Sequence, residues 1–241
     1  MRLTHAVSFV TVAAVASVAS AGPSFTTVQS PSSGELSHGE ILGDLYGGVW
    51  SLNSDGLTLS NGDLTAQRVA DSITNPASVG SGFGPTGDDQ LWRSGAGTVT
   101  ARAVQAADQH TFGVIGASGA FVGLTDTRAF GTSVEVDQDS EFRWALRDRS
   151  TNTTLTSVTG DNARPWRSAR DQLVTYSILG LDDRQDTWLL FWEDRAKGFK
   201  QWSDYDFNDA VIEVKAVPTP GALGVLALSG AFGATRRRRR N

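Results

Sequence analysis

Residues 188–192 read Trp-Leu-Leu-Phe-Trp, and residues 210–216 read Ala-Val-Ile-Glu-Val-Lys-Ala. The first run is apolar throughout, which indicates a central strand covered on both faces. The second run alternates, which predicts a strand with Ile212 and Val214 on one face and Glu213 on the other. These two strands, with the acidic segment that joins them, determine the fold that we expect for the second half of the chain.

Shorter alternating runs lie on the N-terminal side of this pair, separated by turn-forming residues. They are residues 57–59, 66–69, 98–104, 134–136, 142–146 and 174–178. Many short strands with turns between them are typical of a β-sandwich. Residues 40–46 have helical spacing before Gly47-Gly48, and the glycine-rich residues 75–97 indicate a long surface loop. The predicted fold class is mainly β, an antiparallel β-sandwich with one short N-terminal helix, in a single domain over residues 35–216.

The N-terminus has the pattern of a secretory signal peptide. A basic start at Arg2 precedes an apolar stretch over residues 6–18, and Ala19-Ser20-Ala21 supplies the small side chains that signal peptidase accepts. We expect a signal peptide over residues 1–21, cleaved after Ala21, and a leader loop over residues 22–34. A retained N-terminal anchor is the alternative, although the apolar stretch is short for a span of about 20 residues.

The C-terminus combines a proline-rich motif, an apolar segment and a basic block. The motif is Pro218-Thr219-Pro220, and residues 222–234 that follow are apolar or small. The basic block is Arg236, Arg237, Arg238, Arg239 and Arg240. Such a block stays on the cytoplasmic side, and the segment is shorter than the roughly 20 residues of an ordinary transmembrane helix. These features predict a transient sorting helix; a nucleic-acid patch or a nuclear signal is the alternative for the arginines.

Together these C-terminal features resemble the PEP-CTERM sorting signal, which an exosortase reads in bacteria that have an outer membrane. The resemblance covers residues 217–241, with Thr219 in the position where the family has glutamate. It implies processing by an exosortase-like enzyme after signal peptidase has acted, with transient membrane insertion of the C-terminal helix. The mature protein would then lie in the cell envelope, on the outer surface or outside the cell.

Composition excludes several classes of function once the two ends are set aside. Arg2 and the five terminal arginines are six of the 21 basic residues, so the remainder holds 15 basic against 26 acidic residues, a net charge of −11. That charge argues against nucleic acid as a partner and is compatible with divalent cations or with solvation alone. The chain has no cysteine, which excludes disulfides, thiol nucleophiles and thiolate metal sites.

The segment between the two C-terminal strands is the main candidate for a site. Asp204, Asp206 and Asn208 have the spacing of the first three ligands of an EF-hand, but Asp209 replaces the required glycine and Lys215 the final glutamate. We therefore predict a calcium loop of another kind. Its predicted ligands are Asp204, Asp206, Asn208, Asp209, Glu193 and Asp194. The alternative is that these side chains hydrogen-bond backbone amides in an Asx-type turn.

This segment also resembles an uncharacterised domain family of bacterial surface proteins. The family signature is a strand ending in Phe-Glu-Asp, a variable loop, and Asp-x-Asp-[Phe/Tyr]-Asn-Asp. Here residues 191–194 read Phe-Trp-Glu-Asp, with Trp192 inserted, and residues 204–209 read Asp-Tyr-Asp-Phe-Asn-Asp. The resemblance implies an exported β-rich domain without an established activity. A second acidic turn, with Asp182 and Asp186, could add ligands if it folds beside the first.

No catalytic constellation is visible in the sequence, and we expect a protein that is not an enzyme. His110 fits a structural strand residue better than a catalyst. Our expectation is a cell-envelope or extracellular-matrix protein, with calcium as a candidate ligand. A carbohydrate-binding or polysaccharide-degrading module is the competing class, since aromatic side chains stack on sugars; binding of a surface-protein partner is a third possibility. The candidate platforms are Trp92, Trp166, Trp192 and Trp202.

Overall fold

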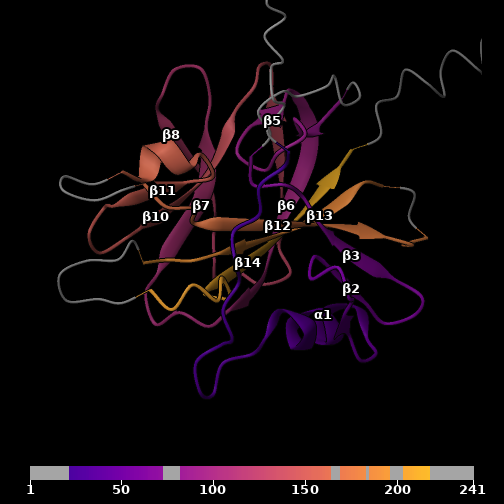
Figure 1. The fold of residues 1–241 in the computed structure, drawn as a ribbon. Helices are drawn as coiled ribbons and strands as arrows, with labels where there is room; N and C mark the ends of the chain where they lie inside the picture. The colour runs from indigo at the N-terminus through magenta and orange to yellow at the C-terminus, as the bar shows by residue number, and fades with distance from the viewer. Residues whose placement is uncertain (1–21, 73–81, 164–168, 183–184, 196–202, 218–241) are drawn as a thin grey trace, which may run out of the picture.

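Two antiparallel sheets that pack face to face form the body of the protein (Figure 1). The computed structural model describes residues 22–72, 82–163, 169–182, 185–195 and 203–217. Every pairing between the named strands is antiparallel. The expected mainly β fold with antiparallel sheets is confirmed.

The larger sheet has eight strands, and its centre is the pair quoted from the sequence. Its strands in spatial order are β1 (Ser51–Leu52), β2 (Thr58–Ser60), β3 (Thr65–Arg68), β12 (Leu173–Leu179), β13 (Thr187–Trp192), β14 (Ala210–Ala216), β6 (Gly95–Val104) and β9 (Ser133–Gln138). A tight turn at Asn61-Gly62 joins β2 to β3, and Gly62 takes the positive φ of 100° that favours glycine.

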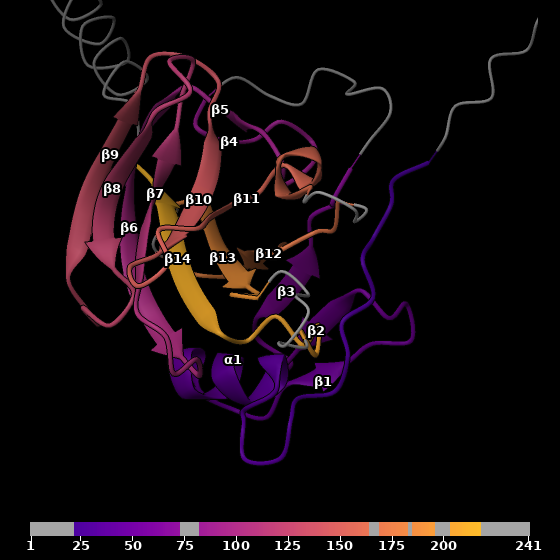
Figure 2. The same ribbon diagram turned by 90° about the vertical axis from the view of Figure 1, so that its left-hand side faces the viewer.

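The smaller sheet lies on one face of the larger one (Figure 2). Its strands in spatial order are β11 (Thr154–Thr156), β10 (Arg143–Asp148), β7 (His110–Ile115) and β8 (Phe121–Asp126). A short pair, β4 (Gly84–Pro85) with β5 (Trp92–Arg93), and the 3₁₀ helix η1 (Thr159–Asn162) complete the described elements. The sequence patterns indicated β10 but missed β8, β11, β4 and β5.

Strand β13 belongs to two hydrophobic cores at once. Trp188, Leu190 and Trp192 pack between the two sheets. Leu189 and Phe191 point to the opposite face, where a second core lies under the helix. Because alternate side chains of a strand point to opposite faces, an all-apolar strand requires such cover on both sides. The expectation of a doubly covered central strand is therefore confirmed.

Helix α1 (His38–Tyr46) covers the second face of the larger sheet, at the bottom of Figures 1 and 2. Ser37 caps its N-terminus: the Ser37 hydroxyl accepts from the Glu40 amide, and the Glu40 carboxylate accepts from the Ser37 amide. Gly47, with φ of 78°, ends it. The short helix predicted over residues 40–46 is confirmed, two residues longer at its start.

One sequence expectation is wrong in the described residues. The stretch over residues 75–97 is not a surface loop throughout, because Phe83 and Trp92 are core residues. Glu213 lies on the face opposite Ile212 and Val214, as expected, and it is buried, at 4 % exposure. Glu213 is buried because the helix side of the sheet is covered. Its carboxylate accepts hydrogen bonds from Tyr46 Oη and Arg102 Nη2 at 2.8 Å each.

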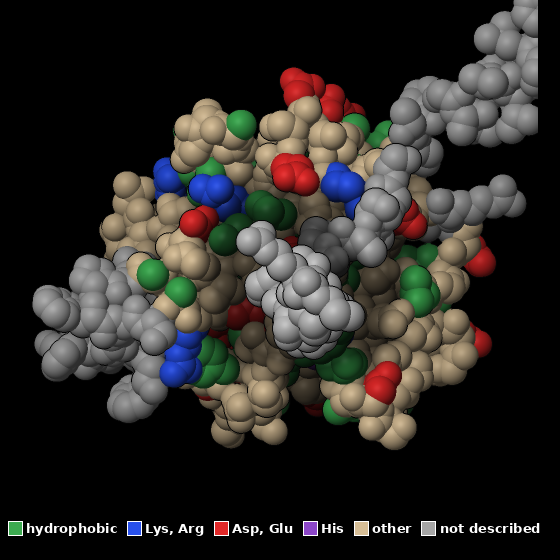
Figure 3. All heavy atoms as spheres, turned by 45° about the horizontal axis from the view of Figure 1, so that its top comes forward, with side chains coloured by type: hydrophobic (Ala, Val, Ile, Leu, Met, Phe, Trp, Pro, Cys, Tyr) green, Lys and Arg blue, Asp and Glu red, His purple; other side chains and the backbone are tan. Residues whose placement is uncertain are grey.

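The expected signal peptide, sorting motif, apolar segment and arginine block lie outside the described residues. Within the described ranges, no helix is long and apolar enough to cross a membrane. On the face drawn in Figure 3, acidic and basic side chains are interspersed, and hydrophobic side chains gather only in small groups. That face therefore offers no broad apolar surface where atoms are described.

Candidate metal centre

The end of β13 and the start of β14 bring three carboxyl groups together. Trp192 pairs with Ala210, so the residues just beyond this pair, Glu193, Asp194 and Asp209, are neighbours. The Asp194 amide donates to Asp209 Oδ2 at 2.9 Å, and the Glu193 amide donates to the Gln172 carbonyl at 3.0 Å. These hydrogen bonds hold the three residues together at the end of the β13–β14 pair.

The three carboxylates form what we call the strand-end cluster: Glu193, Asp194 and Asp209. One oxygen of each lies within 4.8 Å of the others. Glu193 is 1 % exposed, and the side chain of Asp194 is also 1 % exposed. Since Ca²⁺ binds carboxylate oxygens at about 2.3–2.6 Å, oxygens at this spacing can share one ion.

The carboxylate of Asp194 has no hydrogen-bond donor for either oxygen within the described part of the chain. His110 Nε2 lies 3.6 Å from Oδ2, and Arg195 Nε lies 3.6 Å from Oδ1, both beyond hydrogen-bond distance. An ionised buried carboxylate without donors is costly. The site therefore needs either a proton or a cation at this position.

Burial shifts the titration of Glu193 and Asp194. Burial, with the charge of Asp209 adding to it, raises the pKa of Glu193 to about 9 and that of Asp194 to about 8. Burial lowers the pKa of His110, so its imidazole is a poor source of positive charge. Positive charge from Arg195 acts on Asp194 in the opposite direction, but it is shared with Asp108.

A second group of carboxylates lies at the acidic loop, residues 203–209, and includes Glu35 from outside the loop. We call it the loop cluster: Glu35, Asp204 and Asp206, which also bring one oxygen each within 4.8 Å. Tyr205 and Phe207 adopt φ of 58° and 56°, a left-handed conformation that is uncommon outside glycine. The side chain of Phe207 is buried in the helix-side core, which holds the loop in this shape.

The six predicted ligands are divided between these two clusters. Glu193, Asp194 and Asp209 are together, whereas Asp204 and Asp206 lie with Glu35. Asn208 sits beside the loop cluster, where its Nδ2 donates to Asp206 Oδ2 at 2.9 Å and to the Leu36 carbonyl at 3.0 Å. The alternating residues of the loop therefore do not join the strand-end residues in one coordination shell. The Asx-type alternative also has support, because Asp206 Oδ1 accepts from the Asn208 amide.

The second acidic turn is not beside the first. Asp186 precedes β13, and its carbonyl accepts from the Ala216 amide at the opposite end of the β13–β14 pair. The second acidic turn therefore cannot add ligands to an ion bound at Asp209.

Sequence reasoning missed the third acidic group, which we call the inner cluster: Asp71, Asp89 and Asp171. All three are at least 93 % buried. Arg68 Nη2 lies 2.7 Å from Asp71 Oδ1, and Thr26 donates to both Asp71 and Asp171. Glu35 and His110 were missed as neighbours of the acidic loop for the same reason: they are remote in sequence from the segment that they meet.

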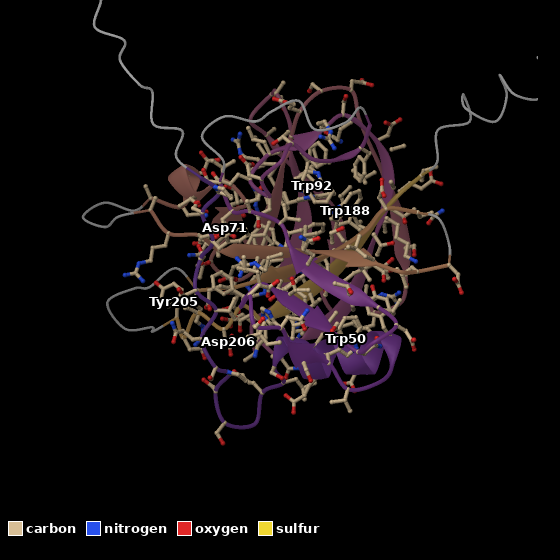
Figure 4. The ribbon with its side chains drawn as sticks, turned by 45° about the vertical axis from the view of Figure 1, so that its right-hand side comes forward. Trp50, Asp71, Trp92, Trp188, Tyr205 and Asp206 are labelled. Atoms are coloured by element: carbon tan, nitrogen blue, oxygen red, sulfur yellow. The ribbon has the colours of Figure 1, made fainter. Side chains whose placement is uncertain are left out.

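The tryptophans of the described residues do not form a sugar platform. Trp92, Trp144 and Trp192 are fully buried, and Trp50 and Trp188 are each 7 % exposed. Figure 4 shows Trp92 and Trp188 inside the molecule. Two of the four suggested platforms, Trp92 and Trp192, are therefore core residues, and the other two, Trp166 and Trp202, lie outside the described residues.

No protein-family model, curated protein or solved structure matches this chain. The two resemblances noted from the sequence stay predictions.

Proposed function

We propose that this chain is an exported, non-catalytic protein of the cell envelope or extracellular matrix, stabilised by a calcium ion in the strand-end cluster. The observation that carries the calcium part is the carboxylate of Asp194, which is buried without a donor next to Glu193 and Asp209. Calcium fits because it accepts 6–8 oxygen ligands in flexible geometry, and the cluster offers only carboxylates.

The position of the cluster favours a structural role for the ion. An ion there would tie the end of β13 to the start of β14. The Asp209 carbonyl accepts from the amides of Gln105 and Ala106, so the tie would extend to the end of β6. Burial of Glu193 and of the Asp194 side chain leaves little room for a substrate. Stabilisation of the larger sheet is therefore a better fit than catalysis.

Thermal unfolding with millimolar calcium, and then with excess chelator, tests this function. At a calcium concentration 100 times the Kd, ligand binding adds about 2.7 kcal/mol to stability. For a domain of this size, that corresponds to a midpoint rise of roughly 5–10 °C. Asp194→Asn should remove the part of the rise that comes from this site and leave the calcium-free protein at least as stable, since it removes a buried carboxylate that no hydrogen-bond donor contacts in the described residues.

Asp139→Asn is the matched control, because Asp139 is an exposed aspartate in a turn. It should keep the full calcium response. An identical midpoint with calcium and with chelator would rule out the calcium role, and the acidic residues would then be turn-forming residues only.

The export part of the proposal rests on the two chain ends and has its own test. Mass spectrometry of the protein from its native host should find an N-terminus at Gly22 and no peptide that contains the five terminal arginines. Recovery of intact ends from the cytoplasm would contradict export and sorting.

A further inference from the structure

The N-terminal segment, residues 22–37, runs along the molecule and meets the acidic loop before α1 begins. Few hydrogen bonds join it to that loop. The Gln29 amide donates to the Tyr205 carbonyl at 2.9 Å, and Ser32 Oγ donates to Asp204 Oδ2 at 2.6 Å. Glu35 also lies near the acidic loop, since its carboxylate belongs to the loop cluster with Asp204 and Asp206.

Three acidic groups at this junction face one another. Asp206 is only 2 % exposed. One carboxylate oxygen each of Glu35, Asp204 and Asp206 lies within 4.8 Å of the others. Carboxylates in such proximity repel one another unless a cation or a proton lies between them.

Asn208 provides an independent sign of a ligand. The residue is 1 % exposed, and its Nδ2 donates both to Asp206 Oδ2 and to the carbonyl of Leu36, the residue after Glu35. The side-chain amide is therefore held between Asp206 and the N-terminal segment. Its Oδ1 is buried and has no donor within the described ranges. A buried acceptor without a donor, on a side chain that contacts Asp206, has the chemistry of a cation ligand.

A path from solvent leads to this position. Asp206 and Asn208 line a cleft of ≈ 480 Å³ together with Ser37 and His38, and Asp204 is exposed. Ions can therefore reach the loop cluster from this cleft without unfolding of the protein.

We propose that Glu35, Asp204, Asp206 and the Oδ1 atom of Asn208 hold a second calcium ion, which fastens the N-terminal segment to the acidic loop. These four side chains would supply at least four oxygens, and water would complete the shell of six to eight. This inference rests on the proposed function in taking calcium as the ion of this fold. The two sites are adjacent, because the Tyr205 amide donates to Glu193 Oε2 at 3.1 Å.

Calorimetric titration of the chelator-treated protein with calcium chloride tests the second site. We expect two ions per chain. Glu35→Gln and Asp204→Asn should each reduce the number to one, as should Asp194→Asn through the other cluster. Glu141→Gln, at an exposed glutamate outside both clusters, is the control and should still bind two.

Hydrogen exchange of residues 23–36 identifies which ion has been lost. Calcium should slow exchange there in the unchanged protein and in Asp194→Asn, but not in Glu35→Gln. If Glu35→Gln and Asp204→Asn both still bind two ions, the second site is overturned and the strand-end site stands. If Asp194→Asn still binds two ions while Glu35→Gln binds one, the proposed function falls and the loop site stands. No calcium uptake overturns both.

Discussion

The acidic loop and the inner cluster both hold buried carboxyl groups, but the groups that surround them differ. Asp206 is buried in the acidic loop, and all three members of the inner cluster are buried. In the inner cluster, Arg68 and Thr26 supply donors to Asp71 and Asp171. In the described residues, the groups of three acidic side chains with oxygens within 4.8 Å of one another are the two beside the acidic loop. In the described residues, Asp89 of the inner cluster and Asp194 of the strand-end cluster both lack a hydrogen-bond donor, and the inner cluster differs in its buried Arg68–Asp71 pair.

The two regions are also separate in space. Figure 4 shows Asp71 away from Asp206, on the same side of the molecule but nearer to its middle. Thr26 links the inner cluster to the N-terminal segment, and Glu35 links that segment to the loop cluster. One segment therefore touches an ion-paired site near its start and the proposed calcium site near its end.

The largest expected effect comes from removing the only basic side chain that bonds to the inner cluster in the described residues. The side chains of Arg68 and Asp71 are 4 % and 6 % exposed. Breaking a buried pair by removing one partner costs about 3–5 kcal/mol. Arg68→Met should therefore lower the free energy of unfolding by that amount, as measured by urea denaturation, and calcium should not restore it.

Arg149→Met is the matched control for that experiment, because Arg149 pairs with Asp126 at the surface. Exposed pairs contribute about 0–1 kcal/mol. Rescue of Arg68→Met by calcium would show that the inner cluster also binds the ion, and the distinction between the two regions would fail.

A smaller effect, and one that depends on pH, is expected at Asp89. Its carboxyl group is completely buried, and neither oxygen has a donor in the described part of the chain. Burial, with the charges of Asp171, Asp71 and Asp88 adding to it, raises the pKa of Asp89 well above its usual value; Arg68 opposes this shift. Burial therefore favours the neutral, protonated form of Asp89 in the folded protein.

The sign of the pH dependence follows from this shift. The folded state binds the Asp89 proton more tightly than the unfolded state, whose pKa is about 3.9. Stability is thus retained below that value and is lost as pH rises toward the folded pKa, by at most about 1.4 kcal/mol per pH unit for one proton. Asp89→Asn should flatten this slope in chelator-treated protein between pH 5 and pH 8. An unchanged slope would mean that Asp89 is ionised and has a cation partner.

The sequence predicted the parts of the fold that have a regular pattern. The run from Trp188 to Trp192 indicated cover on both faces, and the two hydrophobic cores supply it. The prediction of a surface loop was wrong for residues 82–97 because β4 and β5 have only two residues each, too few for a period to be visible. Phe83 and Trp92 reach the core from that stretch without any alternation to indicate it.

The candidate site was predictable only in its local part. Glu193, Asp194 and Asp209 could be joined because they flank two adjacent strands of one hairpin. Glu35 could not be assigned to the site, since its approach to Asp204 depends on the path of the N-terminal segment across the whole fold. The spacing of Asp204, Asp206 and Asn208 also suggested one shell, whereas the left-handed turns at Tyr205 and Phe207 divide the loop between two clusters.

A crystal structure of the protein grown in calcium tests the central claim most directly. We expect an ion bonded to an oxygen of Glu193, of Asp194 and of Asp209, at the distances of about 2.3–2.6 Å that calcium takes. A structure at the same calcium concentration in which these carboxyl groups hydrogen-bond to one another or to water, with no ion between them, would contradict the account.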